Sequence, residues 1–361
     1  MTTVPAPTVS AHHTLTSGHL PRWAPWGLLA LSIAVLGAVL GIVSAASGSE
    51  FSVAGWIVLS VVVYLVMVYA ISRIVEGSRR ALDRFITGVV STAFAIAMVP
   101  LVSVAWTVVT NGLARFDATF FSSSMRGILG EGGGAVHAIW GTVLITGAAA
   151  LISVPIGLMT AVYLIEYGQT ARLGKAITFL VDVMTGIPSI VAGLFAYAVF
   201  AIIFGPGVRM GLAGAVALSV LMIPVVVRSS EEMLRLVPNE LREASYALGV
   251  PKWLTIVKVV LPTSIAGITT GVMLAIARVI GETAPLLITA GFTDALNTNL
   301  SDGRMQTLPV YIYSQYAYKG IPPEAYVDRA WAAALTLILI VMALNLIARF
   351  VAKVFAPKTS H

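Results

Sequence analysis

Long uninterrupted apolar runs are the feature of this sequence that most restricts its fold. One of them extends from Trp26 to Ala46 without a single charged side chain. Runs of about 20 residues match the length of a helix that crosses the hydrocarbon core of a bilayer. The mean hydropathy of +0.93 and a charged fraction of only 11% lie far outside the composition of soluble domains. The sequence therefore predicts an integral membrane protein.

The apolar runs predict an all-α protein with about eight membrane spans. Helices are expected because each backbone amide inside the hydrocarbon must be satisfied within its own segment. The first run is interpreted as a retained span, since it is longer than the apolar part of a secretory signal. The predicted spans cover residues 26–46, 53–72, 86–110, 136–165, 177–205, 211–228, 263–291 and 330–350.

The basic residues predict how the chain is oriented. Most of the 22 lysines and arginines fall in segments that share one side if the N-terminus is cytoplasmic. Positive charge accumulates on the cytoplasmic side of membrane proteins, so both termini are predicted to be cytoplasmic. This distribution accounts for the net charge of +6 without a nucleic-acid partner. The chain has no cysteine, which excludes disulfides and thiolate metal sites.

The fifth predicted span contains a break. Gly186 and Pro188, followed by Ser189, disfavour an unbroken helix within the stretch TGIPSIVAGLF. Proline kinks in membrane helices are often only structural. Broken helices also expose backbone groups to a cavity, which suits a polar substrate. Both interpretations remain open from the sequence.

Two charges lie inside the seventh predicted span. Arg278 lies just past its middle and Glu282 follows four residues later, in the stretch ARVIGETAPLL that also holds Thr283. An arginine at the centre of a spanning helix costs roughly 2.5–3.5 kcal/mol on insertion scales. On a continuous helix the two side chains share a face. They are predicted either to form an internal salt bridge or to bind an oxyanion through the guanidinium fork.

Residues 231–262 form the most polar predicted cytoplasmic segment. Pro238 can open a helix of about three turns that Gly249 and Pro251 close, and a second short helix can follow. From composition alone, this segment is either an amphipathic loop on the membrane surface or a docking element. The chain contains no GxxxxGK[ST] phosphate loop, since Gly174-Lys175 is followed by alanine, so it is not expected to bind ATP.

This segment resembles the EAA loop of bacterial ABC-importer permeases. The matching residues have the spacing of the family motif. Ser245 stands where that motif has its second alanine, and Val259 stands where it has an isoleucine. The resemblance implies a type I importer permease core that contacts a separate ATPase, which binds ATP and Mg, through a coupling helix. The residues that it assigns to this contact are Glu240, Glu243, Ala244, Ser245, Gly249, Leu261 and Pro262.

The stretches GETAPLL and TGIPSIVAGLF are similar to those of the phosphate-specific PstA permease family. The resemblance implies a heterodimer with a PstC-like permease, two PstB-like ATPases, a periplasmic or lipid-anchored phosphate-binding protein, and a place in the bacterial cytoplasmic membrane. It places Arg278, Glu282 and Thr283 on the substrate path. Permeases for phosphonate, sulfate or molybdate, and a self-sufficient secondary transporter, remain the alternatives.

The family core has about six spans, so this chain is predicted to carry an additional N-terminal hairpin of unknown role. The predicted organisation is a disordered tail over 1–25, an accessory hairpin and basic loop over 26–85, a MetI-like permease core over 86–356, and a tail over 357–361. Two long outer loops mix aromatic and polar residues, as in Phe116 to Ser124 and Tyr311 to Gly320. They are predicted to anchor at the membrane interface or to dock an external partner.

Overall fold

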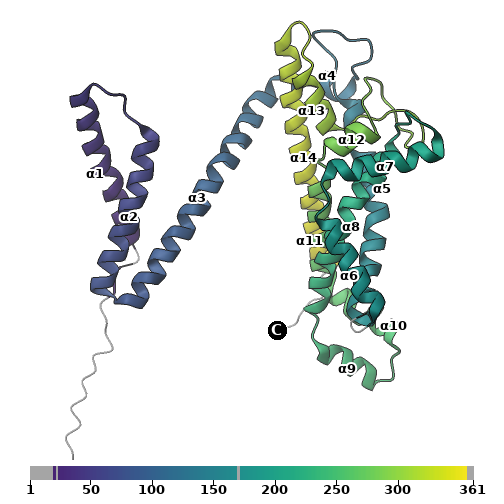
Figure 1. Ribbon diagram of the computed structural model, residues 1–361, viewed down its shortest axis with the longest axis horizontal. Coiled ribbons are helices and arrows are strands. Elements are labelled where there is room, and N and C mark those ends of the chain that lie inside the picture. The colour runs from purple at the N-terminus through teal and green to yellow at the C-terminus, as the bar shows by residue number, and fades with distance from the viewer. Residues whose placement is uncertain (1–18, 22, 169–170, 356–361) are drawn as a thin grey trace, which may run out of the picture. The chain divides into compact units, whose positions relative to one another are not determined.

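The computed structural model describes residues 19–21, 23–168 and 171–355. The chain divides into two compact units, one ending at Ala105 and the other beginning at Trp106 (Figure 1). This division falls inside one long helix, whereas the sequence-based boundary at 85/86 stays a prediction. Most of the predicted tail over 1–25, and all of the tail over 357–361, lie outside the described residues.

The first unit contains α1 (Ala24–Ser47), α2 (Val53–Val75) and most of α3 (Ser78–Gly112). The Ser52 hydroxyl caps α2 by accepting a hydrogen bond from the backbone of Gly55. The Trp56 indole lies against Gly37 and donates to the Ile33 carbonyl at 3.0 Å, which joins α1 to α2. Most other large apolar side chains of these helices are exposed, as expected of helices that face lipid or a partner.

A buried carboxylate closes the turn between α2 and α3. Glu76 accepts hydrogen bonds from the Ser72 hydroxyl, the Arg84 guanidinium and the backbone amide of Leu20, at 2.8–2.9 Å. Arg84 Nε lies 2.6 Å from the same carboxylate. Burial alone would raise the pKa of Glu76, but these donors stabilise the charged form and lower its pKa to about 2. The carboxylate therefore ties three segments together only while it is ionised.

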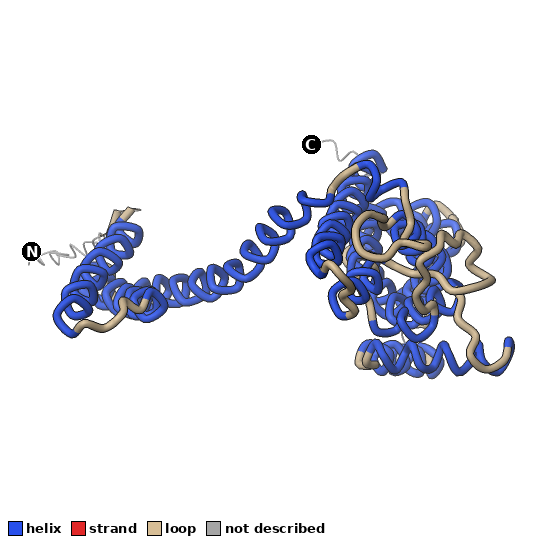
Figure 2. The backbone as a smooth tube through the Cα atoms, turned by 90° about the horizontal axis from the view of Figure 1, so that it is seen from above, coloured by secondary structure: helices blue, strands red, loops and turns tan. Residues whose placement is uncertain are grey.

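The second unit, beginning within α3, is a helical bundle (Figure 1). In Figure 2 its described residues form helices and loops without a strand. Its elements after α3 are η1 (Leu113–Arg115), α4 (Ala118–Ser122), α5 (Val136–Val162), η2 (Tyr163–Tyr167), α6 (Arg172–Thr185), α7 (Ser189–Phe204), α8 (Gly211–Arg235), α9 (Asn239–Ala247), α10 (Lys252–Thr255), η3 (Ile256–Val260), α11 (Leu261–Val279), α12 (Ala284–Thr289), α13 (Leu308–Ala317) and α14 (Pro323–Phe355).

Helix α8 forms the centre of this unit. It packs against α5, α11 and α7, and its buried side chains include Leu218 and Met222. Small residues allow the close approach: a Cβ at Gly157 would lie 2.7 Å from the Val226 side chain, and one at Gly271 would lie 2.4 Å from Ser229 Oγ. These contacts position the helices that carry the candidate site.

Seven helices of the described chain are long and apolar enough to span a membrane, and the bent pair α6 and α7 raises the number to eight. This agrees with about eight predicted spans. The predicted break in the fifth span is confirmed, since this span is two helices bent by 110°. The prediction was wrong for the seventh span, whose first helix ends at Val279 instead of continuing to 291.

The two ends of the second unit differ. Helices α9 and α10 lie at one end, here called the α9 end, and α4 and α13 lie at the other, here called the α13 end (Figure 1). At the α13 end, Phe120 is fully buried and Arg329 donates to the Gly130 and Gly132 carbonyls and to Gln315. Phe120 therefore belongs to a hydrophobic core that includes Leu308 and Tyr311, which contradicts simple interfacial anchoring for Phe120.

Candidate functional site

The break between α6 and α7 lies where the sequence predicts it. Helix α6 ends at Thr185, Gly186 follows it, and α7 begins at Ser189 directly after Pro188. Proline has no amide proton to donate and disfavours a helical conformation in the residue before it, which explains the end of α6. Whether this break borders a substrate path stays a prediction.

A second break follows α11, and it corrects the predicted geometry of Arg278 and Glu282. Helix α11 ends at Val279, the Glu282 amide closes a turn onto the Val279 carbonyl at 3.1 Å, and α12 begins only at Ala284. Pro285 explains the break, since its ring would clash with the carbonyl four residues earlier in a continuous helix. Arg278 thus lies in the last turn of α11, and Glu282 lies outside any helix.

The structure does not contain the salt bridge that was one of the two predictions. In the described part of the chain, Arg278 and Glu282 form no ion pair with each other or with another residue. The Arg278 side chain is exposed, and Glu282 and Thr283 are half-buried. A cation in the last turn of a helix interacts favourably with the helix dipole, which lowers the cost of this position.

The two breaks lie close together. A Cβ built at Gly193 in α7 would lie 2.6 Å from Pro285 Cα in α12, so only glycine permits this contact. Leu286 and Ala290 pack in turn against Gly214 in the first turn of α8. The motifs TGIPSIVAGLF and GETAPLL, which are far apart in sequence, therefore form one packed unit around the start of α8.

The helix predicted after Pro238 is present as α9, and its role in ATPase coupling stays a prediction. Pro238 precedes it, and Gly249 ends the turn after it with φ of +76°, a conformation that favours glycine. Glu240, Glu243 and Ala244 are exposed. Leu261 and Pro262 begin α11. The exposed acidic face of α9 is thus connected through α10 and η3 to the helix that carries Arg278.

Ser245, which departs from the family pattern, has a structural explanation. It is buried, and its hydroxyl forms a 2.8 Å hydrogen bond with the hydroxyl of Thr255 in α10. A buried hydroxyl needs such a partner. The pair of hydroxyls therefore joins α9 to α10 at the position where the family has an alanine.

Glu166, which was not among the predicted site residues, contacts α9. It lies in η2, the π-helical end of α5, and its side chain is almost fully buried against Arg242 of α9. Arg242 donates from Nε to Glu166 at 3.1 Å and also to the Val237 and Leu234 carbonyls at 2.6 and 3.0 Å. In the sequence, the charge of Glu166 in the stretch YLIEYGQ is the only feature that could have pointed to this contact.

A second cation strengthens this attachment. Lys252 of α10 donates to the backbone carbonyl of Glu166, and its ammonium lies 4.6 Å from the centre of the Tyr167 ring. A cation over an aromatic face is attracted by the ring quadrupole. The end of α5 is therefore fixed to both α9 and α10.

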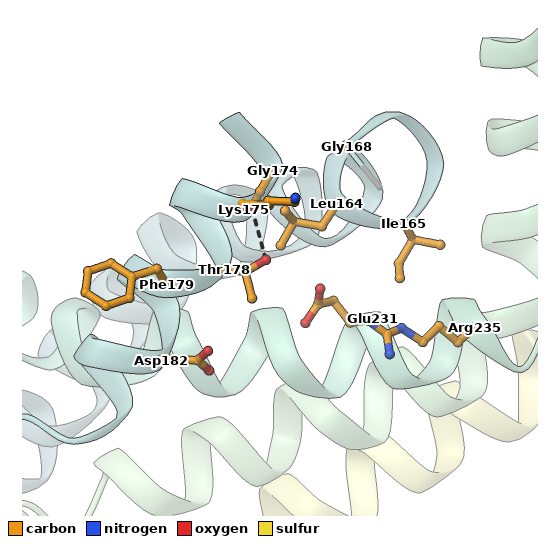
Figure 3. Close-up of a pocket in the computed structure, with 10 residues that line it drawn as sticks. All are labelled: Leu164, Ile165, Gly168, Gly174, Lys175, Thr178, Phe179, Asp182, Glu231 and Arg235. Carbon is orange, nitrogen blue, oxygen red and sulfur yellow. Dashed lines mark hydrogen bonds between the residues drawn. The ribbon is translucent and has the colours of Figure 1, made fainter. Parts of the chain in front are cut away.

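A cavity of about 560 Å³ lies beside this region, between η2, α6 and α8 (Figure 3). Lys175 and Arg235 contribute cations to its wall, while Asp182 and Glu231 both bind Arg228. Gly174 is explained by packing, since a Cβ there would lie 2.1 Å from the Gly168 carbonyl oxygen. This cavity does not include Arg278, Glu282 or Thr283.

Comparison with known proteins agrees with the fold and the motifs. Residues 153–361 match the family model of the binding-protein-dependent transport system inner membrane component. The chain is 48% identical over 280 residues to phosphate transport system permease protein PstA 1 of Mycobacterium tuberculosis, covering 76% of this chain and 90% of that protein. It is 40% identical over 255 residues to PstA of Pasteurella multocida, covering 71% and 87%.

Solved structures show the same fold at low identity. An inward-facing MetNI methionine ABC transporter chain aligns with a TM-score of 0.51 at 21% identity, over 62% of this chain and 96% of that chain. A chain of a bacterial alginate ABC transporter aligns with a TM-score of 0.55 at 14% identity, over 80% and 100%. The chain has a MetI-like permease fold and belongs to the PstA family, as a multi-pass inner-membrane permease subunit of an ABC importer.

Proposed function

We propose that this chain imports inorganic phosphate and forms one half of its path through the membrane. The observation that carries this proposal is the 48% identity to a phosphate transport permease across 90% of that relative's length. Arg278, at the end of α11, has no ion-pair partner among the described residues and supports the proposal, since an uncompensated cation inside an apolar segment usually serves an ion or substrate.

Arg278 is the proposed contact for phosphate. Its planar guanidinium can donate paired hydrogen bonds to a tetrahedral oxyanion. Glu282 follows in the turn beyond α11, where its carboxylate can accept a hydrogen bond from a protonated phosphate oxygen. Sulfate is fully ionised near neutral pH and has no such proton, so this pair favours phosphate. Thr283 supplies a hydroxyl beside them.

The coupling segment is proposed to receive motion from a separate ATPase. Glu240, Glu243 and Ala244 are exposed on α9, which makes them available to a partner. The rigid attachment of α9 to α5 through Glu166 would transmit the displacement of α9 into the bundle. In this proposal ATP and Mg bind to the ATPase, and this chain binds no cofactor.

The proposed assembly contains a PstC-like permease as the second half of the path, two PstB-like ATPases at the α9 end, and a periplasmic or lipid-anchored phosphate-binding protein at the α13 end. Both termini are proposed to be cytoplasmic. A partner permease would cover the exposed Arg278 and complete the path. The accessory hairpin would face lipid or that partner.

The proposal is tested with the complete transporter in vesicles. Phosphate uptake should depend on this chain and resist excess sulfate, and the variant Glu243→Gln should hydrolyse ATP with reduced phosphate uptake per ATP. Glu131→Gln changes an exposed carboxylate at the α13 end and serves as the matched control. Competition by sulfate would mean that the substrate is another oxyanion and not phosphate. Normal phosphate uptake per ATP in Glu243→Gln would contradict the role of α9.

A further inference from the structure

Two arginines from different loops converge on one glycine at the α13 end. A Cβ built at Gly291 would lie 3.0 Å from Arg209 Cδ and 3.5 Å from Arg304 Cδ. Gly291 has φ of +76°, so both its backbone conformation and its surroundings favour glycine. Arg209 precedes α8 and Arg304 precedes α13. The stems of both side chains therefore pass along the same small residue.

Backbone hydrogen bonds hold these loops in place. The Met210 amide donates to the Thr289 carbonyl at 3.1 Å, and the Met305 amide donates to the Ala290 carbonyl at 3.1 Å. Met210 and Met305 are both buried. Each arginine is thus the neighbour of a buried, hydrogen-bonded residue, which fixes where its side chain begins.

Neither arginine has a carboxylate partner within the described residues. The loop that contains Arg304 also contains Asp294 and Asp302, but neither forms an ion pair with Arg304 or Arg209. Arg115, at the same end, is paired with Asp117. Two like charges held on rigid loops repel each other, and that repulsion is relieved when an anion lies between them.

Arg209 and Arg304 lie further from the α9 end of the bundle than Arg278 does. The six residues of α12, about 9 Å of helix, separate the turn after Arg278 from Gly291. Arg209 lies at the start of α8, and α8 ends next to α9. The pair therefore lies at the opposite end of the bundle from α9, beyond Arg278.

We propose that Arg209 and Arg304 form an oxyanion-binding site at the α13 end, which receives phosphate before it reaches Arg278. This inference rests on the proposed function of the chain and adds a second site to its path. Each guanidinium presents several donors in a fixed fork, and two forks can surround a tetrahedral anion. Arg209 is half-buried and Arg304 exposed, so the site is open to solution in the isolated chain.

The experiment compares Arg209→Gln/Arg304→Gln with the wild-type chain in the complete transporter, reconstituted in phosphatidylcholine vesicles with its binding protein. Initial phosphate uptake should fall about tenfold, the gain that a focused cationic site gives an anion. The concentration of phosphate-loaded binding protein that half-saturates ATP hydrolysis should not change. Arg126→Gln, which removes another exposed arginine from the α13 end, should leave uptake unchanged.

The absence of cysteine from this chain permits a second, independent test. Arg304→Cys should lose uptake, regain much of it after modification with the cationic reagent aminoethyl methanethiosulfonate, and lose more with the anionic sulfonatoethyl reagent. Arg126→Cys should respond to neither reagent. Vesicles with the wild-type chain measure any reaction at cysteines of the other subunits.

The outcomes separate this site from the function on which it rests. Unchanged uptake in the double glutamine variant would overturn the site while phosphate import by the wild-type chain still stood. A rise in the half-saturating concentration of binding protein would mean that the pair docks that protein instead. A defect that appears only in vesicles with phosphatidylglycerol would assign the pair to a lipid headgroup. Absence of wild-type phosphate uptake would overturn the proposed function itself.

Discussion

Arg242 in α9 lies 3.0 Å from the Glu166 carboxylate at the end of α5, and both side chains are largely buried. Arg242 also binds the Val237 and Leu234 carbonyls at the end of α8. This one guanidinium therefore connects α9 to α5 and to the end of α8. A displacement of α9 cannot leave α5 and α8 unmoved while these bonds persist.

Breaking this pair should impair both stability and coupling. We expect Glu166→Gln to lower the free energy of unfolding by about 3 kcal/mol, because removal of one partner leaves a buried charge unpaired. Phosphate uptake per ATP should fall in the same variant. Thermal unfolding and paired uptake and hydrolysis assays of the reconstituted transporter measure the two effects.

The exchanged variant Glu166→Arg/Arg242→Glu provides the control. It should recover part of both properties, because opposite charges again face each other. If the exchanged variant recovers stability but phosphate uptake per ATP is normal in both the single and the exchanged variant, the pair only stabilises the fold and does not transmit motion.

The contact between α7 and α12 is tested by two glycine substitutions. Gly193→Ala should destabilise the protein by about 2 kcal/mol, since its new Cβ would overpack against the Pro285 backbone at 2.6 Å. Gly147→Ala is the matched control, because Gly147 is also helical and nothing lies within 4 Å of its Cβ position. That variant should gain up to about 1 kcal/mol from helix propensity. Equal melting temperatures of Gly193→Ala and the wild-type protein in detergent would contradict this contact between α7 and α12.

The first unit should show a pH dependence that originates at Glu76. Its pKa is lowered from 4.5 to about 2, so its contribution to stability is complete above pH 4.5 and disappears as the pH falls towards 2. The protection of the amides at the turn between α2 and α3, measured as the intrinsic exchange rate divided by the observed rate at the same pH, should fall on acidification in the wild-type chain. In Glu76→Gln this protection should be low already at pH 7 and change little with pH. Protection that does not change with pH in the wild-type chain would contradict the role of this carboxylate.

The sequence predicted the helices well and the site only in part. Apolar runs identify spans directly, because the bilayer requires long helices of one composition. The break at Gly186 and Pro188 was also visible, since both residues act locally on the backbone. Pro285 carries the same local signal for the end of α11. The apolar run continues through Pro285, however, so hydropathy alone extends the predicted span to residue 291.

Contacts between distant segments could not be predicted in this way. Glu166 and Arg242 are separated by 76 residues, and the stretch around Glu166 looks like an ordinary loop. The convergence of Arg209 and Arg304 on Gly291 depends equally on tertiary packing. The coupling segment was predicted because its residues are contiguous and carry a family spacing, whereas its attachment to α5 exists only in three dimensions.

The measurement that tests the account most directly is radiolabelled phosphate uptake by cells that carry all subunits and either the wild-type chain or Arg278→Gln. Arg349→Gln, at an exposed position near the end of α14, is the control for loss of a cation. With equal amounts of inserted protein, we expect Arg278→Gln to lose at least about tenfold in uptake, since its amide cannot replace a charged, bidentate fork. Arg349→Gln should retain the phosphate uptake of the wild-type chain. Full phosphate uptake by Arg278→Gln would contradict the assignment of Arg278 to the phosphate path.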